Sequence, residues 1–163
     1  MSAPTTTLAA ALGWAAGMRS MTSPAALARA LASRTSPVPR LVRRRRQPAR
    51  SLGSERAASL LPLAAAGEMV ADKLPAIPPR TSPLPLVGRV ASGALVGAAL
   101  AAARRQNPVL PMLVGAVSAG ASSFAMMELR RWAGERFDLP DPAVAVVEDV
   151  LALGISLAAT RDV

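Results

Sequence analysis

The chain has 163 residues, a formal net charge of +9, and a composition that is 52% hydrophobic but only 2% aromatic. Because it contains no cysteine and no histidine, it excludes disulfide frameworks, thiolate nucleophiles, Cys/His zinc sites and imidazole acid–base catalysis. The apolar residues are mainly Ala, Leu and Val mixed with Gly and Ser, which is typical of helices that pack closely in lipid. This composition favours a membrane protein, and we expect no metal or cofactor.

Five apolar segments predict an all-α fold, a polytopic transmembrane bundle of about five helices in one membrane domain. The segments span about 7–31, 57–74, 86–103, 108–129 and 142–160. A soluble Ala-rich bundle is the alternative, but runs such as LAAALGWAAG offer no polar face to water.

Several features within these segments carry structural expectations. Arg19 and Pro24 interrupt the first segment, and AGMRSMTSP is expected to break the helix and leave backbone lining a cavity. Gly93 and Gly97 form a small-xxx-small pair, which predicts close helix packing. Arg89 is expected to lie at the start of the third helix. Residues 32–56 are rich in Arg and Pro and predict a loose loop.

The arginines of this loop bear on partners and topology. A cytoplasmic loop next to the membrane explains the cluster through the positive-inside rule, and anionic lipid headgroups are expected near Arg43–Arg46. No nucleic acid is expected, because no aromatic residue interrupts the basic segment. Five crossings of the inner (cytoplasmic) membrane would then put the N-terminus outside and the C-terminus inside. The loop of residues 129–141, with its arginines, would lie outside, against the rule.

Two pairs of segments resemble each other weakly. LGWAAGMRSMTSPAALARAL resembles LVGAVSAGASSFAMMELRRW, and LAAAGEMVAD resembles AVAVVEDVLA. An odd number of crossings would separate each segment from its copy, which would make an inverted-topology repeat of the kind many transporters use. Chance similarity between Ala/Gly-rich segments is the other explanation, and both stay open.

Ionisable residues inside membrane helices are costly, so each is a candidate functional residue. The candidates for an intramembrane polar centre are Arg19, Glu68, Asp72, Glu148 and Asp149. In one interpretation Arg19 binds an anion, while Glu68 and Asp72, which share a helix face, bind protons or cations. In the other, Arg19 forms a structural ion pair with Glu68 or Glu148. No Walker loop, GxSxG or GxGxxG motif is present, so no catalytic residue and no enzyme activity are expected.

The motifs GMRSMTSPAAL, GEMVADKLP, RVASGALVGAAL and LPDPAVAVVEDVLALG resemble those of a bacterial group. The chain resembles the domain-of-unknown-function family 4126, small predicted multi-pass membrane proteins with no established activity. The most specific piece is E-x-x-A-D-K-x-P. The resemblance implies a membrane location and a helical fold but no substrate, and it makes the loop of residues 32–56 an insertion. It implies that the characteristic polar positions are Arg19, Glu68, Asp72, Lys73 and Pro75, with Glu148 and Asp149 as a late acidic pair.

Two functions are therefore expected as alternatives. One is a small transporter, channel or solute/lipid-binding protein with an intramembrane Arg/Glu/Asp centre. The other is a non-catalytic membrane assembly protein whose charges are interhelical ion pairs. A transporter of this length would need a homo-oligomer to enclose a path, with the Gly93/Gly97 face as its contact surface.

Overall fold

The structure is a computed structural model that describes residues 3–33, 47–71, 83–137, 140–161 and 163. Over these residues it is all-helical and has no strand, which confirms the predicted fold class. The described helices number seven rather than about five, because the first segment forms two helices and a short helix lies within the predicted loop. They are α1 (Thr5–Met18), α2 (Thr22–Ser33), α3 (Ala49–Leu52), α4 (Glu55–Ala71), α5 (Pro83–Ala103), α6 (Val109–Phe137) and α7 (Asp141–Thr160).

Prolines lie in the first turn of several of these helices. Pro83, Pro111 and Pro142 lie in the first turns of α5, α6 and α7, where a backbone N–H would have no acceptor within the helix. Pro24 occupies the first turn of α2 in the same way, so it starts a helix instead of interrupting one. The predicted end of the fourth segment at Leu129 is also wrong, because α6 continues for two more turns.

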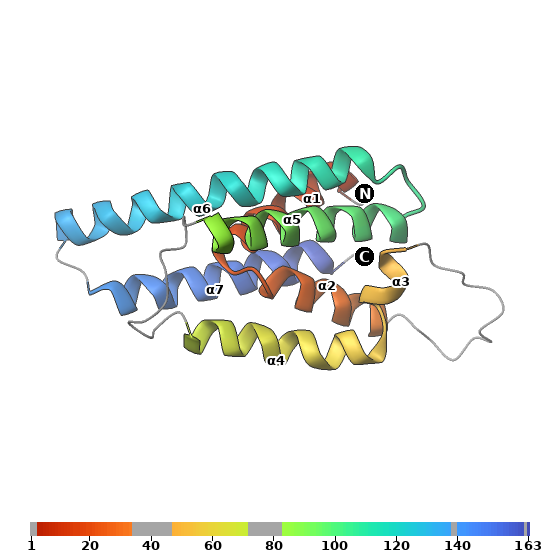
Figure 1. The fold of residues 1–163 in the computed structure, drawn as a ribbon, viewed down its shortest axis with the longest axis horizontal. Helices are drawn as coiled ribbons and strands as arrows, with labels where there is room; N and C mark the ends of the chain where they lie inside the picture. The colour runs from red at the N-terminus through yellow and green to blue at the C-terminus, as the bar shows by residue number, and fades with distance from the viewer. Residues whose placement is uncertain (1–2, 34–46, 72–82, 138–139, 162) are drawn as a thin grey trace.

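The chain reverses direction between α1 and α2. The Ser23 hydroxyl donates a hydrogen bond to the Leu12 carbonyl oxygen at 2.8 Å, although eleven residues of uninterrupted helix would separate them by about 16 Å. Ala9 and Leu31, near the outer ends of the two helices, belong to one buried cluster. Residues 5–33 therefore form a helical hairpin, visible in Figure 1, whose tip is Arg19–Met21. With 14 and 12 residues, its helices are shorter than the roughly 20 needed to cross a bilayer.

Both termini lie at the same end of the bundle (Figure 1). The Arg104 guanidinium donates to the Ala3 carbonyl oxygen at 2.8 Å, and Val163 packs against the same buried cluster as Ala103. From α4 onward the helices run alternately between the two ends (Figure 1). The five predicted crossings would put the termini at opposite ends, whereas the reversal between α1 and α2 brings both termini to one end of the bundle.

Within the described part of the chain, three helices are long and apolar enough to span a membrane: Pro83–Ala103, Val109–Phe137 and Pro142–Thr160. Large apolar side chains on their surfaces are exposed, among them Val87, Val117 and Val150. Exposed apolar side chains along helices of this length are expected where lipid covers a protein. The chain is therefore an integral membrane protein.

Glycines bring α1, α5 and α6 into close contact. A Cβ atom added to Gly13 or Gly93 would lie 2.3 Å from the Gly115 carbonyl oxygen, and one added to Gly97 would lie 2.1 Å from that of Pro111. Gly93 and Gly97 thus pack helices together, as expected. They do so within one chain, so their face is occupied and is not available as the predicted dimer contact.

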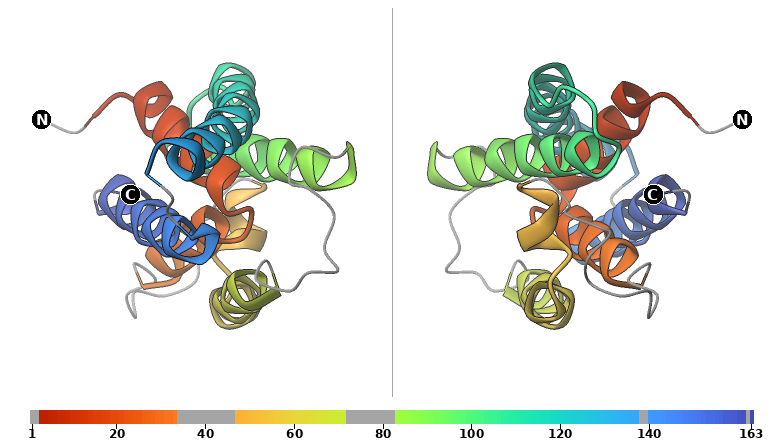
Figure 2. Two further views of the ribbon diagram at one scale, coloured as in Figure 1. Left: turned by 90° about the vertical axis from the view of Figure 1, so that its left-hand side faces the viewer. Right: turned by 90° about the vertical axis from the view of Figure 1, so that its right-hand side faces the viewer.

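The end-on views show how the remaining helices surround this group. The hairpin helix α2 lies between α7 and α4, and α4 lies on the far side of the bundle from α6 (Figure 2). The main neighbour of α4 is α2. The first pair of the proposed sequence repeat has no structural counterpart, because α1 and α2 form a hairpin whereas α6 is one continuous helix.

Candidate functional site

The hairpin tip places two helix ends inside the bundle. Arg19 has an extended backbone, with φ −140° and ψ 110°, and ends α1. Pro24 has no N–H to donate to the Ser20 carbonyl oxygen four residues earlier, and the Ser92 hydroxyl of α5 donates to that oxygen instead. Helix ends carry backbone groups that need partners from elsewhere, so the tip requires polar side chains from neighbouring helices.

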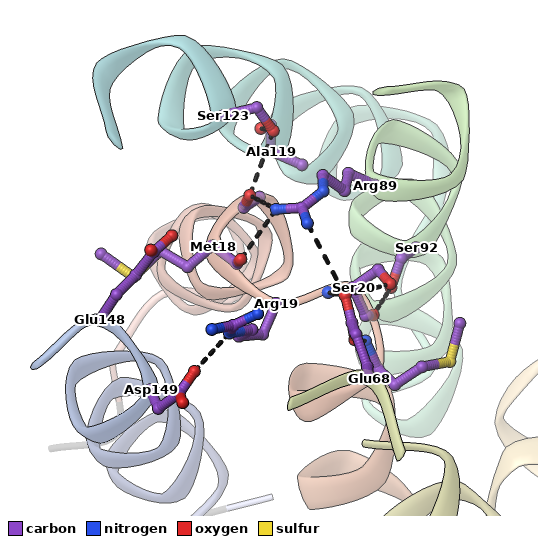
Figure 3. A network of polar contacts seen from close by, with 12 residues as sticks. Met18, Arg19, Ser20, Glu68, Arg89, Ser92, Ala119, Ser123, Glu148 and Asp149 are labelled. Atoms are coloured by element: carbon purple, nitrogen blue, oxygen red, sulfur yellow. Dashed lines mark hydrogen bonds and ion pairs between the residues drawn. The ribbon is translucent and has the colours of Figure 1, made fainter. Parts of the chain in front are cut away.

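The C-terminal end of α1 is capped by an arginine. Nη1 of Arg89, on α5, donates to the carbonyl oxygens of Gly17 and Met18 at 2.6 and 2.8 Å. The Ser123 hydroxyl of α6 lies 3.1 Å from the Gly17 oxygen and 2.8 Å from the Ala119 carbonyl oxygen of its own helix, so its single hydrogen is shared between the two (Figure 3). The Arg89 side chain is 4% exposed. A cation suits this position because carbonyl groups give a helix C-terminus a partial negative charge.

The N-terminal end of α2 is capped by a carboxylate. Oε1 of Glu68, on α4, accepts hydrogen bonds from the Ser20 backbone N–H and hydroxyl, and Oε2 accepts one from the Met21 N–H, all at 2.8 Å. Nη2 of Arg89 lies 3.8 Å from Glu68 Oε1, so the two caps are also an ion pair. The negative charge complements the partial positive charge of the helix N-terminus.

Arg19 itself points toward α7 (Figure 3). Its side chain is completely buried, and its Nε donates to Oδ1 of Asp149. Among the described residues, two arginines and two carboxylates therefore meet at the tip from the hairpin, α4, α5 and α7, and the formal charges of these four cancel. The four residues are Arg19, Glu68, Arg89 and Asp149.

The structure assigns the predicted site residues differently from the sequence. Glu68 contacts Ser20, Met21 and Arg89 and forms no ion pair with Arg19. Glu148 forms an ion pair with Arg130 of α6, with Nε 3.0 Å from Oε2. Consecutive residues of a helix point about 100° apart, which separates Glu148 from its neighbour Asp149. Arg130 was expected in a loop but lies within α6.

Three further residues carried by the family resemblance, Asp72, Lys73 and Pro75, lie outside the described residues. The sequence reasoning missed Arg89 because it placed this residue at the start of a helix. Pro83 and Pro85 could have indicated the correct start of the helix, because proline is tolerated in a first helical turn. A helix that begins at Pro83 places Arg89 almost two turns from its N-terminal end.

Hydroxyl groups extend the polar contacts along the hairpin. The Ser122 hydroxyl donates to the Trp14 carbonyl oxygen at 2.7 Å, and the hydroxyls of Ser23 and Ser156 lie 3.0 Å apart. Among the residues described, the Thr22 hydroxyl is buried next to the tip and has no hydrogen-bond partner. A buried hydroxyl of this kind usually bonds a water or ligand.

The comparisons with known proteins agree with the sequence resemblance. The sequence model of a family described as "Domain of unknown function (DUF4126)" matches residues 6–161, nearly the whole chain. No curated protein and no solved structure matches. The matched range contains every helix from α2 to α7 and nearly all of α1, including all four charged residues of the tip. The chain therefore belongs to the DUF4126 family.

Proposed function

We propose that this chain is a small membrane transport protein that binds and passes an ion or small polar solute at the hairpin tip. The observation that carries the proposal is the broken helix: two helix ends and four ionised groups meet inside the bundle. An apolar helix that crossed without a break would need none of these charges. Non-helical backbone within a membrane protein occurs where protein covers it or where it lines a cavity.

The energetic cost of the tip supports a function beyond stability. Buried ion pairs contribute little net stability, because desolvation offsets the attraction between the charges. Intramembrane ionisable residues often mark the paths of ions or solutes. The side chains of Glu68 and Asp149 are each 14% exposed, whereas Arg19 is fully buried. A solute would thus approach at the carboxylates, and the Thr22 hydroxyl is available to it or to an accompanying water.

The same proposal includes an orientation in the membrane. The end of the bundle that carries both termini also carries the α5–α6 turn, with Arg104 and Arg105. The positive-inside rule assigns such an end to the cytoplasm. We therefore place both termini in the cytoplasm, with the hairpin entering the membrane from that side, in place of the outward N-terminus expected from five crossings.

Flux through the purified protein tests the transport proposal. The chain is reconstituted in liposomes that contain a pH-sensitive dye. A potassium gradient with valinomycin sets a membrane potential that drives protons across the bilayer. Chloride and sodium fluxes are measured in parallel. We expect one of these ions to move faster than in empty liposomes. Glu68→Gln should lower the flux, because the amide removes the negative charge at the tip. The matched control is Glu128→Gln on the exposed surface of α6, which should leave the flux unchanged.

A membrane assembly protein is the second candidate, and a specific observation favours it. The charged residues of the tip already bind helix ends or one another, which is what a structural clamp would require. If proton, chloride and sodium fluxes all equal those of empty liposomes while Glu68→Gln lowers the folded yield, the clamp replaces the transporter. Measuring folded yield beside flux separates the two.

A further inference from the structure

The two ends of the bundle differ in charge. Among the described side chains, the end with both termini has six basic residues and one acidic residue, Glu55. The opposite end has three arginines and three glutamates, including the Arg130–Glu148 and Arg131–Glu128 ion pairs. Counted over the described side chains alone, one end therefore carries a net positive charge, whereas the charges of the other cancel. The basic residues at the positive end are Arg29, Arg50, Arg56, Arg104, Arg105 and Arg161.

The short helix α3 fixes part of this positive surface. Ala49 and Leu52 are buried and belong to the same cluster as residues of α1, α2 and α5, whereas Arg50 and Ser51 face outward. The helix thus inserts one apolar side into the end of the bundle and presents an arginine on the other. Its place at the end of the bundle can be followed in Figure 1. An amphipathic element of this kind lies at the level of lipid headgroups in a membrane.

Two further arginines come from the helices next to α3. Arg29 is exposed near the C-terminal end of α2, and Arg56 is exposed in the first turn of α4. Helices α2, α3 and α4 contact one another, so the three arginines extend from one packed unit. The first turn of α4 adds its own partial positive charge, and the Ser54 hydroxyl accepts a bond from the Ala57 N–H there.

The α5–α6 turn also keeps an arginine at this end at a conformational cost. Arg105 has a φ of 57°, in the left-handed region, where glycine is the usual residue after a helix. The N–H groups of Arg105 and Gln106 donate to the carbonyl oxygens of Ala102 and Ala101, the pattern of a helix end that favours glycine. The exposed Arg105 therefore adds a positive charge to the same end as Arg104.

We propose that the surface formed by Arg29, Arg50 and Arg56 binds the headgroup of an anionic phospholipid. The charge is complementary, since guanidinium groups bind phosphate oxygens in a bidentate manner and attract anionic lipid at the membrane surface. The surface adjoins apolar helices, so the acyl chains of the same lipid can cover Leu60 and Leu63 of α4, which are largely exposed. This site is separate from the hairpin tip and does not depend on transport.

Lipid retention by the purified full chain tests the proposal. The protein in neutral detergent is titrated with phosphatidylglycerol or phosphatidylcholine, and native mass spectrometry counts the bound lipids. We expect phosphatidylglycerol to bind more tightly than phosphatidylcholine. The double variant Arg50→Gln/Arg56→Gln should bind it roughly tenfold or more weakly, because each arginine near an anionic surface contributes several-fold to affinity. Both side chains are exposed, so the fold should be unaffected.

The matched control removes two exposed arginines from the opposite end, Arg131→Gln/Arg136→Gln, and should retain the wild-type affinity. Arg50→Lys/Arg56→Lys should keep most of the binding, since it keeps the charge. The proposal is overturned if phosphatidylcholine binds equally well, or if the control loses as much affinity as the Arg50/Arg56 variant. It is also overturned if 10 mM inorganic phosphate raises the thermal stability as much as phosphatidylglycerol does, since the site would then recognise the free ion.

Discussion

Replacing Gly97 by alanine tests the close contact between α5 and α6. The added Cβ would lie 2.1 Å from the Pro111 carbonyl oxygen, whereas ordinary contact begins at 3.4 Å, a shortfall of about 1.3 Å. The obstructing atoms belong to the backbone, so the two helices must separate to relieve the clash. Overpacking of this kind costs about 1–3 kcal/mol, and the better helix propensity of alanine offsets about 1 kcal/mol. We expect a net loss of about 2 kcal/mol, at the upper end of this range.

The control for this prediction is Gly154→Ala in α7. No atom lies within 4 Å of the Cβ that this substitution adds, so only the gain in helix propensity remains, about 0.5–1 kcal/mol. Thermal unfolding in detergent, followed by loss of the monodisperse peak in size-exclusion chromatography, compares the two variants. For a chain of this length, 1 kcal/mol corresponds to roughly 2–4 °C in Tm, so the variants should differ by roughly 5–12 °C. Equal Tm values for Gly97→Ala and Gly154→Ala would refute the contact.

Three further substitutions test other parts of the structure by the same unfolding measurement. Arg19→Gln should destabilise the protein by about 3–5 kcal/mol, because it takes the guanidinium away from Asp149. Adding Asp149→Asn should recover part of this loss. If the double variant instead loses the sum of the two single losses, the pairing is contradicted. Ser92→Ala removes the donor to the Ser20 carbonyl oxygen and should cost about 1–3 kcal/mol, and no change in Tm would contradict this bond. Arg105→Gly relieves the left-handed backbone and should stabilise by about 1 kcal/mol, so a loss of stability would show that the turn needs the side chain.

Much of the fold follows from apolar runs in the sequence. The runs gave five helical segments, and AGMRSMTSP correctly predicted a break at Arg19. The reversal at that break could not be predicted, because a break fixes where a helix stops but not the direction in which the next one leaves. That direction depends on contacts distant in sequence, such as Glu68 on the Ser20 N–H and Arg89 on the Gly17 carbonyl oxygen.

Three of the four charged residues at the tip were predicted from the sequence, but their pairing was not. Arg19, Glu68 and Asp149 were all identified from the cost of charges inside membrane segments, and all three lie at the tip. Which carboxylate faces Arg19 depends on the rotation of α7 about its axis, and a change of one residue rotates the choice by about 100°. The sequence contains no signal for that rotation. The predicted pairing of Arg19 with Glu68 or Glu148 was therefore wrong, and Asp149 takes that place.

The central claim is that the first two helices enter and leave the membrane on one side. The chain has no cysteine, so single cysteines at positions 3, 135 and 161 can each be tested with a membrane-impermeant maleimide in intact cells and in inverted membrane vesicles. We predict that Ala3→Cys and Arg161→Cys react only in inverted vesicles and that Glu135→Cys reacts only in intact cells. If Ala3→Cys and Arg161→Cys react from opposite sides, the first segment crosses the membrane and the re-entrant hairpin is wrong.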